Sequence, residues 1–168
     1  MTAIENAASV LLKQHHIELN PRMLALALED CESMVLDDGA ELCNEGAHAQ
    51  EMWILLSGLI EVRKRGLPLD KPLAVVSAPA LMGHMGLVNG TQRSASCKAR
   101  GRCDLLRLKA SAFYDLLARQ DTEGHIFRRL LIASMNRQLE RGNDKLQKVS
   151  DRNDLLHATV SLDGWTQD

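Results

Sequence analysis

One segment near the middle of the chain has the composition of a site for an anion. It contains, in order, Gly83, His84, Met85, Gly86, Leu87, Arg93, Ser94 and Ala95. A turn at Gly83 followed by the start of a helix would point the next backbone N–H groups inward, and such groups favour a phosphate. Arg93 on the next strand can add a charge-assisted, bidentate contact, and Ser94 a hydroxyl. The simpler alternative is an exposed Arg93 at a strand end.

Such a site needs a framework, and the residues around it predict a layer of short strands. Ile60 and Val62 alternate with charged residues, and Leu106 and Leu108 do the same, which is typical of half-buried strands. Glycines punctuate the region at positions 39, 46, 58, 66, 83, 86, 90 and 101. Turn signals at this spacing favour an all-β sandwich, barrel or roll.

Helices are predicted on either side of this layer. Asn20 can cap a helix that has Pro21 in its first turn. Ser111 is the predicted N-cap of the first helix after the strands, and a longer helix is expected to begin near Thr122 or Glu123. We therefore divide the chain into N-terminal helices (1–31), a β layer (32–110), C-terminal helices (111–160) and a tail (161–168).

The clearest periodic signal is an apolar seam in the C-terminal helical region. Its positions are Ile132, Met135, Leu139, Gly142, Leu146, Val149, Asn153, Leu156 and Val160. This spacing over about four heptads is typical of a coiled coil. A single helix lying on the strands would use only part of the seam, so we favour a parallel two-stranded coiled coil between protomers. The predicted homodimer contacts are Ile132, Met135, Leu139, Leu146 and Val149.

The overall composition argues against several classes of protein. A formal net charge of −2 gives no reason to expect a protein that binds nucleic acids or membrane surfaces. No apolar run approaches the roughly 20 residues of a membrane span, and the first residues lack the pattern of a secretory signal, so a cytoplasmic location is expected. The four cysteines form no CxxC pair, which predicts reduced thiols and no metal site. Nucleophile-elbow, P-loop and HExxH motifs are absent, so we expect neither an enzyme nor a cofactor.

A longer pattern joins the anion segment to the predicted strands. It consists of Gly39, Leu42, Glu45-Gly46, residues 52–58 (MWILLSG), Ile60-Glu61-Val62, residues 81–87 (LMGHMGL) and residues 90–95 (GTQRSA). With its flanking helices, this pattern resembles the cyclic-nucleotide-binding domain family over about residues 30–148. The resemblance implies a mainly β fold, a jelly-roll-like double-stranded β-roll with N-terminal helices and a long C-terminal dimerisation helix. It also implies that cyclic AMP or another cyclic nucleotide is the ligand, with Arg93 on its phosphate.

His84 departs from the family pattern, which has a glutamate that accepts a hydrogen bond from the ribose hydroxyl. A neutral imidazole can accept that bond only weakly, and a protonated one would be attracted to phosphate instead. With a reference pKa near 6.5, the balance is expected to depend on pH. Losing a charged hydrogen bond should cost about 1.5–3 kcal/mol, which is roughly a ten- to hundredfold loss of affinity.

Two further departures concern the base and the output. The resemblance places Gly142 and Asn143 where the catabolite activator protein of this family has two hydroxyl side chains that contact adenine. Gly142 offers only backbone, whereas Asn143 keeps donor and acceptor capacity, so base selectivity is in question. Transcription factors of the family continue into a helix-turn-helix domain, which this sequence does not contain, so direct DNA binding is not expected.

These observations leave three functional hypotheses. In the first, the chain is a regulatory module that binds a cyclic nucleotide and transmits ligand state through a dimeric long helix to a partner protein. In the second, the pocket has degenerated, and the chain is a ligand-free pseudo-receptor that acts as a dimeric interaction scaffold. In the third, the non-acidic His84 admits another anion such as a cyclic dinucleotide. The departures at His84 and Gly142 favour the second hypothesis. The first is favoured by the residues that keep the family pattern, which are Gly83, Gly86, Arg93, Ser94 and Ala95.

Overall fold

The computed structural model of the chain describes residues 2–66 and 71–163, with side chains described up to residue 152. Two helices, α1 (Ala3–Gln14) and α2 (Pro21–Ala27), precede the strands. Thr2 caps α1 through a reciprocal pair of hydrogen bonds with Glu5. The Asn20 side chain accepts from the backbone N–H of Arg22, and Pro21 is the first residue of α2, so the predicted start of this helix is confirmed.

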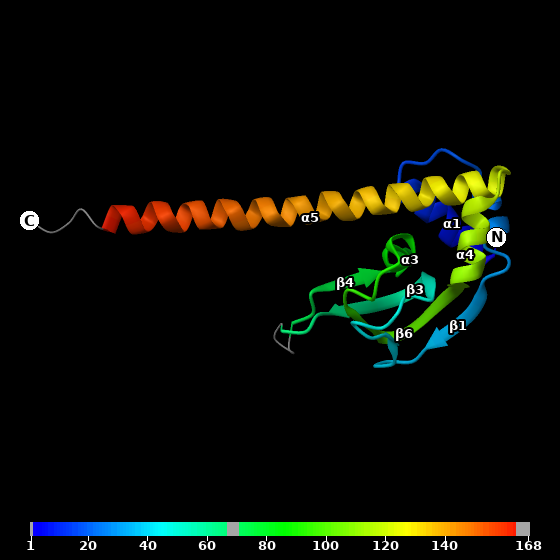
Figure 1. The fold of residues 1–168 in the computed structure, drawn as a ribbon, viewed down its shortest axis with the longest axis horizontal. Coiled ribbons are helices and arrows are strands. Elements are labelled where there is room, and N and C mark those ends of the chain that lie inside the picture. The colour runs from blue at the N-terminus through cyan, green and yellow to red at the C-terminus, as the bar shows by residue number, and fades with distance from the viewer. Residues whose placement is uncertain (1, 67–70, 164–168) are drawn as a thin grey trace, which may run out of the picture. The chain divides into compact units, whose positions relative to one another are not determined.

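In the part of the chain that the structure describes, six antiparallel strands form one sheet, and Figure 1 labels four of them. They are β1 (Glu32–Leu36), β2 (Glu41–Cys43), β3 (Glu51–Arg63), β4 (Ala74–Ser77), β5 (Ala80–Met82) and β6 (Ser96–Lys109). The long strands β3 and β6 pair along most of their length. Outside them lie β1 and β2 on β6, and β4 and β5 on β3. The predicted β layer with flanking helices is therefore confirmed.

A kink in the central strand pair requires glycine. The register between β3 and β6 shifts on both sides of Ser57, and Gly58 has a φ of +95°. A Cβ at Gly58 would lie 2.6 Å from the carbonyl oxygen of Arg102 and 2.7 Å from the Cys103 sulfur. A side chain there would therefore be strained and would clash with the partner strand. The core next to this kink is formed by Trp53, Leu55, Ile60, Met82, Ala99, Cys103 and Leu105.

The remaining helices of the described residues are α3 (His84–Asn89), between β5 and β6, and α4 (Ala110–Ala118) and α5 (Thr122–Asp163), which follow β6. The predicted start of the long helix near Thr122 is confirmed. The prediction that Ser111 is an N-cap is wrong, because β6 runs directly into α4. Lys109, the last strand residue, has extended backbone angles and occupies the cap position, so Ser111 lies inside the first turn.

The chain divides into two compact units, residues up to 132 and residues from 133 onward. The second unit consists of the remainder of α5. Its seam residues Leu139, Leu146 and Val149 are 64%, 70% and 58% exposed, and Met135 is half-buried. The side chains of Asn153, Leu156 and Val160 lie outside the described residues. Among the described helices, none combines the length and apolarity required to cross a bilayer.

Candidate functional site

Segment 83–93 is positioned by the end of β5 and two left-handed glycines. Gly83 has a φ of +75° and precedes the first residue of α3, and Gly90 has a φ of +61° and follows its last. A Cβ at Gly83 would lie 2.6 Å from Nη1 of Arg93 and 2.8 Å from the Trp53 ring. Glycine is therefore required here both by backbone conformation and by the close approach of two side chains.

Arg93 is buried, with 7% of its surface exposed. Its Nη1 donates to the carbonyl of Gly83 at 2.9 Å, and its Nη2 donates to the carbonyl of Glu51 at 2.5 Å. The guanidinium carbon lies 4.5 Å from the ring centroid of Trp53, which is a cation–π contact. The alternative of an exposed strand-end arginine is therefore wrong, and Arg93 instead fixes the start of α3 to β3.

The backbone of Arg93 is held as firmly as its side chain. Its N–H donates to the carbonyl of Ala47 at 2.8 Å, and its carbonyl accepts from Gly46 at 2.9 Å. Gly86 brings α3 close to the same loop, because a Cβ there would lie 2.6 Å from the Cβ of Ala49. That Cβ position is also 3.7 Å from Nη1 of Arg93. The structure therefore brings Gly83, Gly86 and Arg93 together, as the sequence predicted.

His84 is the first residue of α3 and is completely buried. Burial lowers its pKa to about 4, and the nearby His15, at the end of α1, adds a smaller effect in the same direction. The imidazole is therefore neutral at neutral pH. The expectation that His84 changes charge around pH 6.5 is wrong, because the side chain packs inside the protein and is not solvated.

The other predicted residues of the segment differ in exposure. Leu87 is buried, and Met85 is half-buried. Ser94 is exposed, and its carbonyl accepts a hydrogen bond from Lys64 at 2.8 Å. Ala95 is half-buried just before β6. Ser94 and Ala95 therefore extend the segment toward the solvent edge of the sheet.

Gly142 and Asn143 lie on α5, in the unit that follows residue 132. Both are exposed, and a Cβ at Gly142 would meet no described atom within 4 Å. The site in the first unit is formed without them, and their role toward a base stays a prediction.

Two aromatic residues belong to the site although the sequence gave no specific reason to select them. Trp53 lies inside an apolar strand, where it is indistinguishable from core, yet it faces both Arg93 and Gly83. Tyr114, the single tyrosine of the chain, donates from its hydroxyl to the carbonyl of Leu87 at 2.8 Å. An aromatic-poor composition of 3% was the one available signal, because each aromatic residue is then a candidate for a special position.

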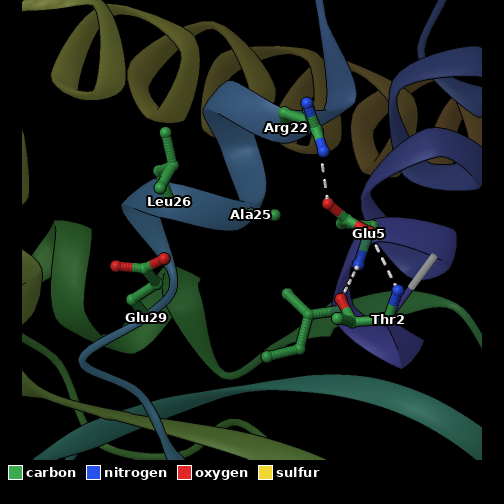
Figure 2. Close-up of a pocket in the computed structure, with 7 residues that line it drawn as sticks. Thr2, Glu5, Arg22, Ala25, Leu26 and Glu29 are labelled. Atoms are coloured by element: carbon green, nitrogen blue, oxygen red, sulfur yellow. Dashed lines mark hydrogen bonds and ion pairs between the residues drawn. The ribbon is translucent and has the colours of Figure 1, made fainter.

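A separate groove of about 480 Å³ lies between α1 and α2 (Figure 2). In the close-up, Glu5 and Arg22 face one another across it, 3.5 Å apart, and Leu26 lies at its side. Its lining residues are Thr2, Ile4, Glu5, Arg22, Ala25, Leu26 and Glu29. None of the predicted site residues lines this groove. Within the described residues, no cluster of histidine, cysteine and carboxylate side chains could hold a metal ion.

Comparison with known proteins agrees with this geometry. The family model described as "Cyclic nucleotide-binding domain" matches residues 33–120, which include the whole segment 83–93. A search of curated proteins found no match.

Solved structures of similar fold are numerous. The catabolite activator protein of Thermus thermophilus is 25% identical, with a TM-score of 0.67 over 83% of this chain and 62% of that one. A cyclic nucleotide-binding domain from Methylobacillus flagellatus is 22% identical, with a TM-score of 0.71 over 86% and 84%. The regulatory domain of Toxoplasma gondii PKA, solved with cAMP, is 18% identical, with a TM-score of 0.54 over 75% and 47%. The chain thus spans less than two thirds of the length of the first and third of these.

Proposed function

Because the chain belongs to the cyclic nucleotide-binding domain family, we propose that segment 83–93 binds a cyclic nucleotide, with cyclic AMP as the first candidate. The observation that carries this proposal is the placement of Arg93 at the start of α3. A guanidinium has five N–H donors, and the two carbonyl contacts of Arg93 leave others to meet phosphate oxygens. The solved relative from Toxoplasma gondii carries cAMP, which makes this nucleotide the natural first ligand to test.

A regulatory role needs a physical connection from the site to the C-terminal helices. The Tyr114 hydroxyl links α4 to the Leu87 carbonyl on α3. The neighbouring ring of Phe113, 5.4 Å from that of Tyr114, packs edge-to-face against Phe127 of α5 with centroids 5.8 Å apart, and both phenylalanine rings are fully buried. A ligand that shifts α3 can therefore bias α4 and the start of α5, provided it binds one arrangement more tightly than the other.

We further propose that α5 pairs with the same helix of a second protomer and presents the ligand state to a partner protein. Support comes from Ile132, Leu139, Leu146 and Val149, which are all more than half exposed at a/d positions. Apolar side chains at this spacing gain by burial against an identical seam. The role is regulatory and not catalytic in this proposal.

The pseudo-receptor hypothesis remains the second candidate, and two observations favour it. His84 stands where the family has its ribose-binding glutamate, and it is buried with 0% of its surface exposed. A side chain in that position offers the ribose no acceptor unless α3 moves. Arg93 also favours this candidate, because its hydrogen bonds to two backbone carbonyls already use part of the donor capacity of its guanidinium.

Titration calorimetry with cyclic AMP, cyclic GMP and cyclic di-GMP at neutral pH distinguishes these functions. Low-micromolar binding of one ligand is expected. Arg93→Lys should weaken it about tenfold or more, because lysine keeps the charge but cannot make a bidentate contact. Arg100→Lys on β6 is the matched control, since Arg100 is exposed and makes only a long contact with Glu61 at 3.9 Å.

The outcomes separate cleanly if the fold of each variant is checked by its thermal unfolding. No heat up to millimolar ligand would refute the binding proposal and favour the pseudo-receptor. Equal affinity of Arg93→Lys and wild type would remove Arg93 from the site. In the binding protein, Tyr114→Phe should leave affinity within a few-fold but reduce the ligand-induced protection of α4 in hydrogen exchange, because its link to α3 is lost.

A further inference from the structure

Two cysteines face each other across neighbouring strands. Cys43 ends β2, and in the antiparallel pairing of β2 with β6 its register partner is Cys97. The register shifts between Glu41 and Cys43, which marks a β-bulge, and the two side chains are close enough to share a hydrogen bond across it. Their sulfur atoms are therefore neighbours, as a disulfide requires. Both side chains are half-buried and pack against the hydrophobic core, so each keeps part of its surface accessible to a small solute.

The two thiols also interact directly, and unequally. A hydrogen bond from Cys97, helped by the positive charge of Arg93, lowers the pKa of the Cys43 thiol to about 7. The same hydrogen bond, together with burial, raises the pKa of Cys97. In its thiol form Cys43 also contacts the carbonyl of Ala95 at 3.9 Å, which places its sulfur toward β6. Cys43 is thus the sulfur that carries negative charge, and Cys97 keeps the proton.

The remaining cysteines provide a contrast within the same chain. Burial, with a smaller effect of Asp30, raises the pKa of Cys31 to about 12. Cys103 is fully buried in the core, where its thiol donates to the carbonyl of Leu59 at 3.1 Å. Neither lies opposite another cysteine in the strand register. Both are therefore expected to react slowly with oxidants and alkylating reagents.

We propose that Cys43 and Cys97 form a dithiol site that a hydroperoxide oxidises to a disulfide joining β2 to β6. The Cys43 thiolate attacks the terminal oxygen of the peroxide, the O–O bond breaks, and the departing alkoxide or hydroxide takes up a proton. Cys97 then attacks the sulfur of the resulting sulfenic acid. The S–O bond breaks, and water leaves with the proton of Cys97. Two thiols lose two electrons and two protons in total, and the hydroperoxide accepts the two electrons.

The site lies beside the proposed nucleotide site without depending on it. Arg93 is the charge that acts on both thiols, and β2 leads into the loop whose Gly46 and Ala47 bond the Arg93 backbone. Glu51 is the acidic group that opposes this charge at Cys43. The disulfide is tested on the protein itself, so its failure and a failure of nucleotide binding are distinguishable.

The experiment uses the full chain, reduced and then exposed to hydrogen peroxide at neutral pH, followed by alkylation and mass spectrometry. Loss of two of the four thiols, and of two hydrogen masses, is expected. After trypsin, residues 94–98 (SASCK) should be linked to residues 23–63. Since the latter peptide also holds Cys31, the Cys31→Ser variant assigns the bridge to Cys43 and serves as the matched control. Dithiothreitol should restore all thiols.

The rate at which Cys43 is alkylated gives a second readout, and it can be measured on the wild-type protein. At pH 7 Cys43 should be alkylated about tenfold faster than an ordinary exposed thiol, because about half of it is thiolate. Cys97→Ser should stop at a sulfenic acid that dimedone traps, and Cys43→Ser should show no fast oxidation. The proposal would be overturned by loss of all four thiols at equal rates, by a bridge between other cysteines, or by an unchanged oxidation rate in Cys43→Ser.

Discussion

Folding stability should fall between pH 7 and pH 5 in the wild-type protein, and replacing His84 with glutamine should abolish most of that fall. The wild-type imidazole is completely buried, and burial holds its pKa near 4 in the folded chain. In the unfolded chain the same group titrates near 6.5. Glutamine keeps hydrogen-bonding capacity at this position and removes the titration.

The magnitude follows from proton linkage. Between the two pKa values the unfolded chain binds a proton that the folded chain does not, so stability falls as pH falls. With values of 6.5 and about 4, the free energy of unfolding should drop by roughly 2 kcal/mol from pH 7 to pH 5. Glu32, whose pKa is lowered to about 2 by hydrogen bonds from Lys109 and Arg107, loses its contribution only below about 4.5, outside this window.

Urea unfolding at pH 7, 6 and 5, at one protein concentration, measures this difference. His48→Gln is the matched control, because it makes the same substitution at an exposed position. NMR titration of the His84 ring gives the folded pKa directly. A wild-type slope that survives in His84→Gln, or a ring that titrates near 6.5, would refute the argument from burial.

Two further predictions test the packing of the site and the seam. Gly83→Ala should lower the free energy of unfolding by about 3 kcal/mol, and the control Gly101→Ala by about 1 kcal/mol. Both positions have a positive φ, but only a Cβ at Gly83 would clash with Arg93 and Trp53. Equal losses in urea unfolding would contradict this clash. The double variant Leu139→Asp, Leu146→Asp should be a monomer by light scattering, because it places charges in the apolar seam. The control Gln147→Asp lies off the seam and should stay dimeric. A double variant that remains dimeric would place the interface elsewhere.

Much of the framework could be predicted because its signals are local. Alternation around Ile60 and Leu106 has the period of a strand, and Asn20-Pro21 is a helix start, so both were found without tertiary information. The pairing of Gly83 with Arg93 was also accessible, because both belong to one short pattern of residue types.

The burial of the site residues could not be predicted in the same way, because it depends on partners distant in sequence. Arg93 is covered by Trp53 and by the Glu51 carbonyl, and the residues next to Arg93 in the sequence do not indicate either contact. His84 follows a glycine at a predicted turn, where exposure is the natural expectation, yet it packs near the end of α1. Ser111 failed as a cap for a related reason, since pairing with β3 extends β6 to Lys109.

Because β6 ends at Lys109 and α4 begins at Ala110, no loop residue separates the strand from the helix. With no linker residue, the direction in which Tyr114 and Phe113 face is set by the phase of the last strand residues. Inserting one residue there would turn α4 by roughly 100° about its own axis. At the other end of α4 the Arg119 backbone is extended, and a side chain of α5 holds the turn, because Arg128 donates to the carbonyls of Leu117 and Arg119. The two ends of α4 are therefore fixed in different ways: continuous backbone sets its rotation at β6, and the Arg128 side chain of α5 ties down its last turn.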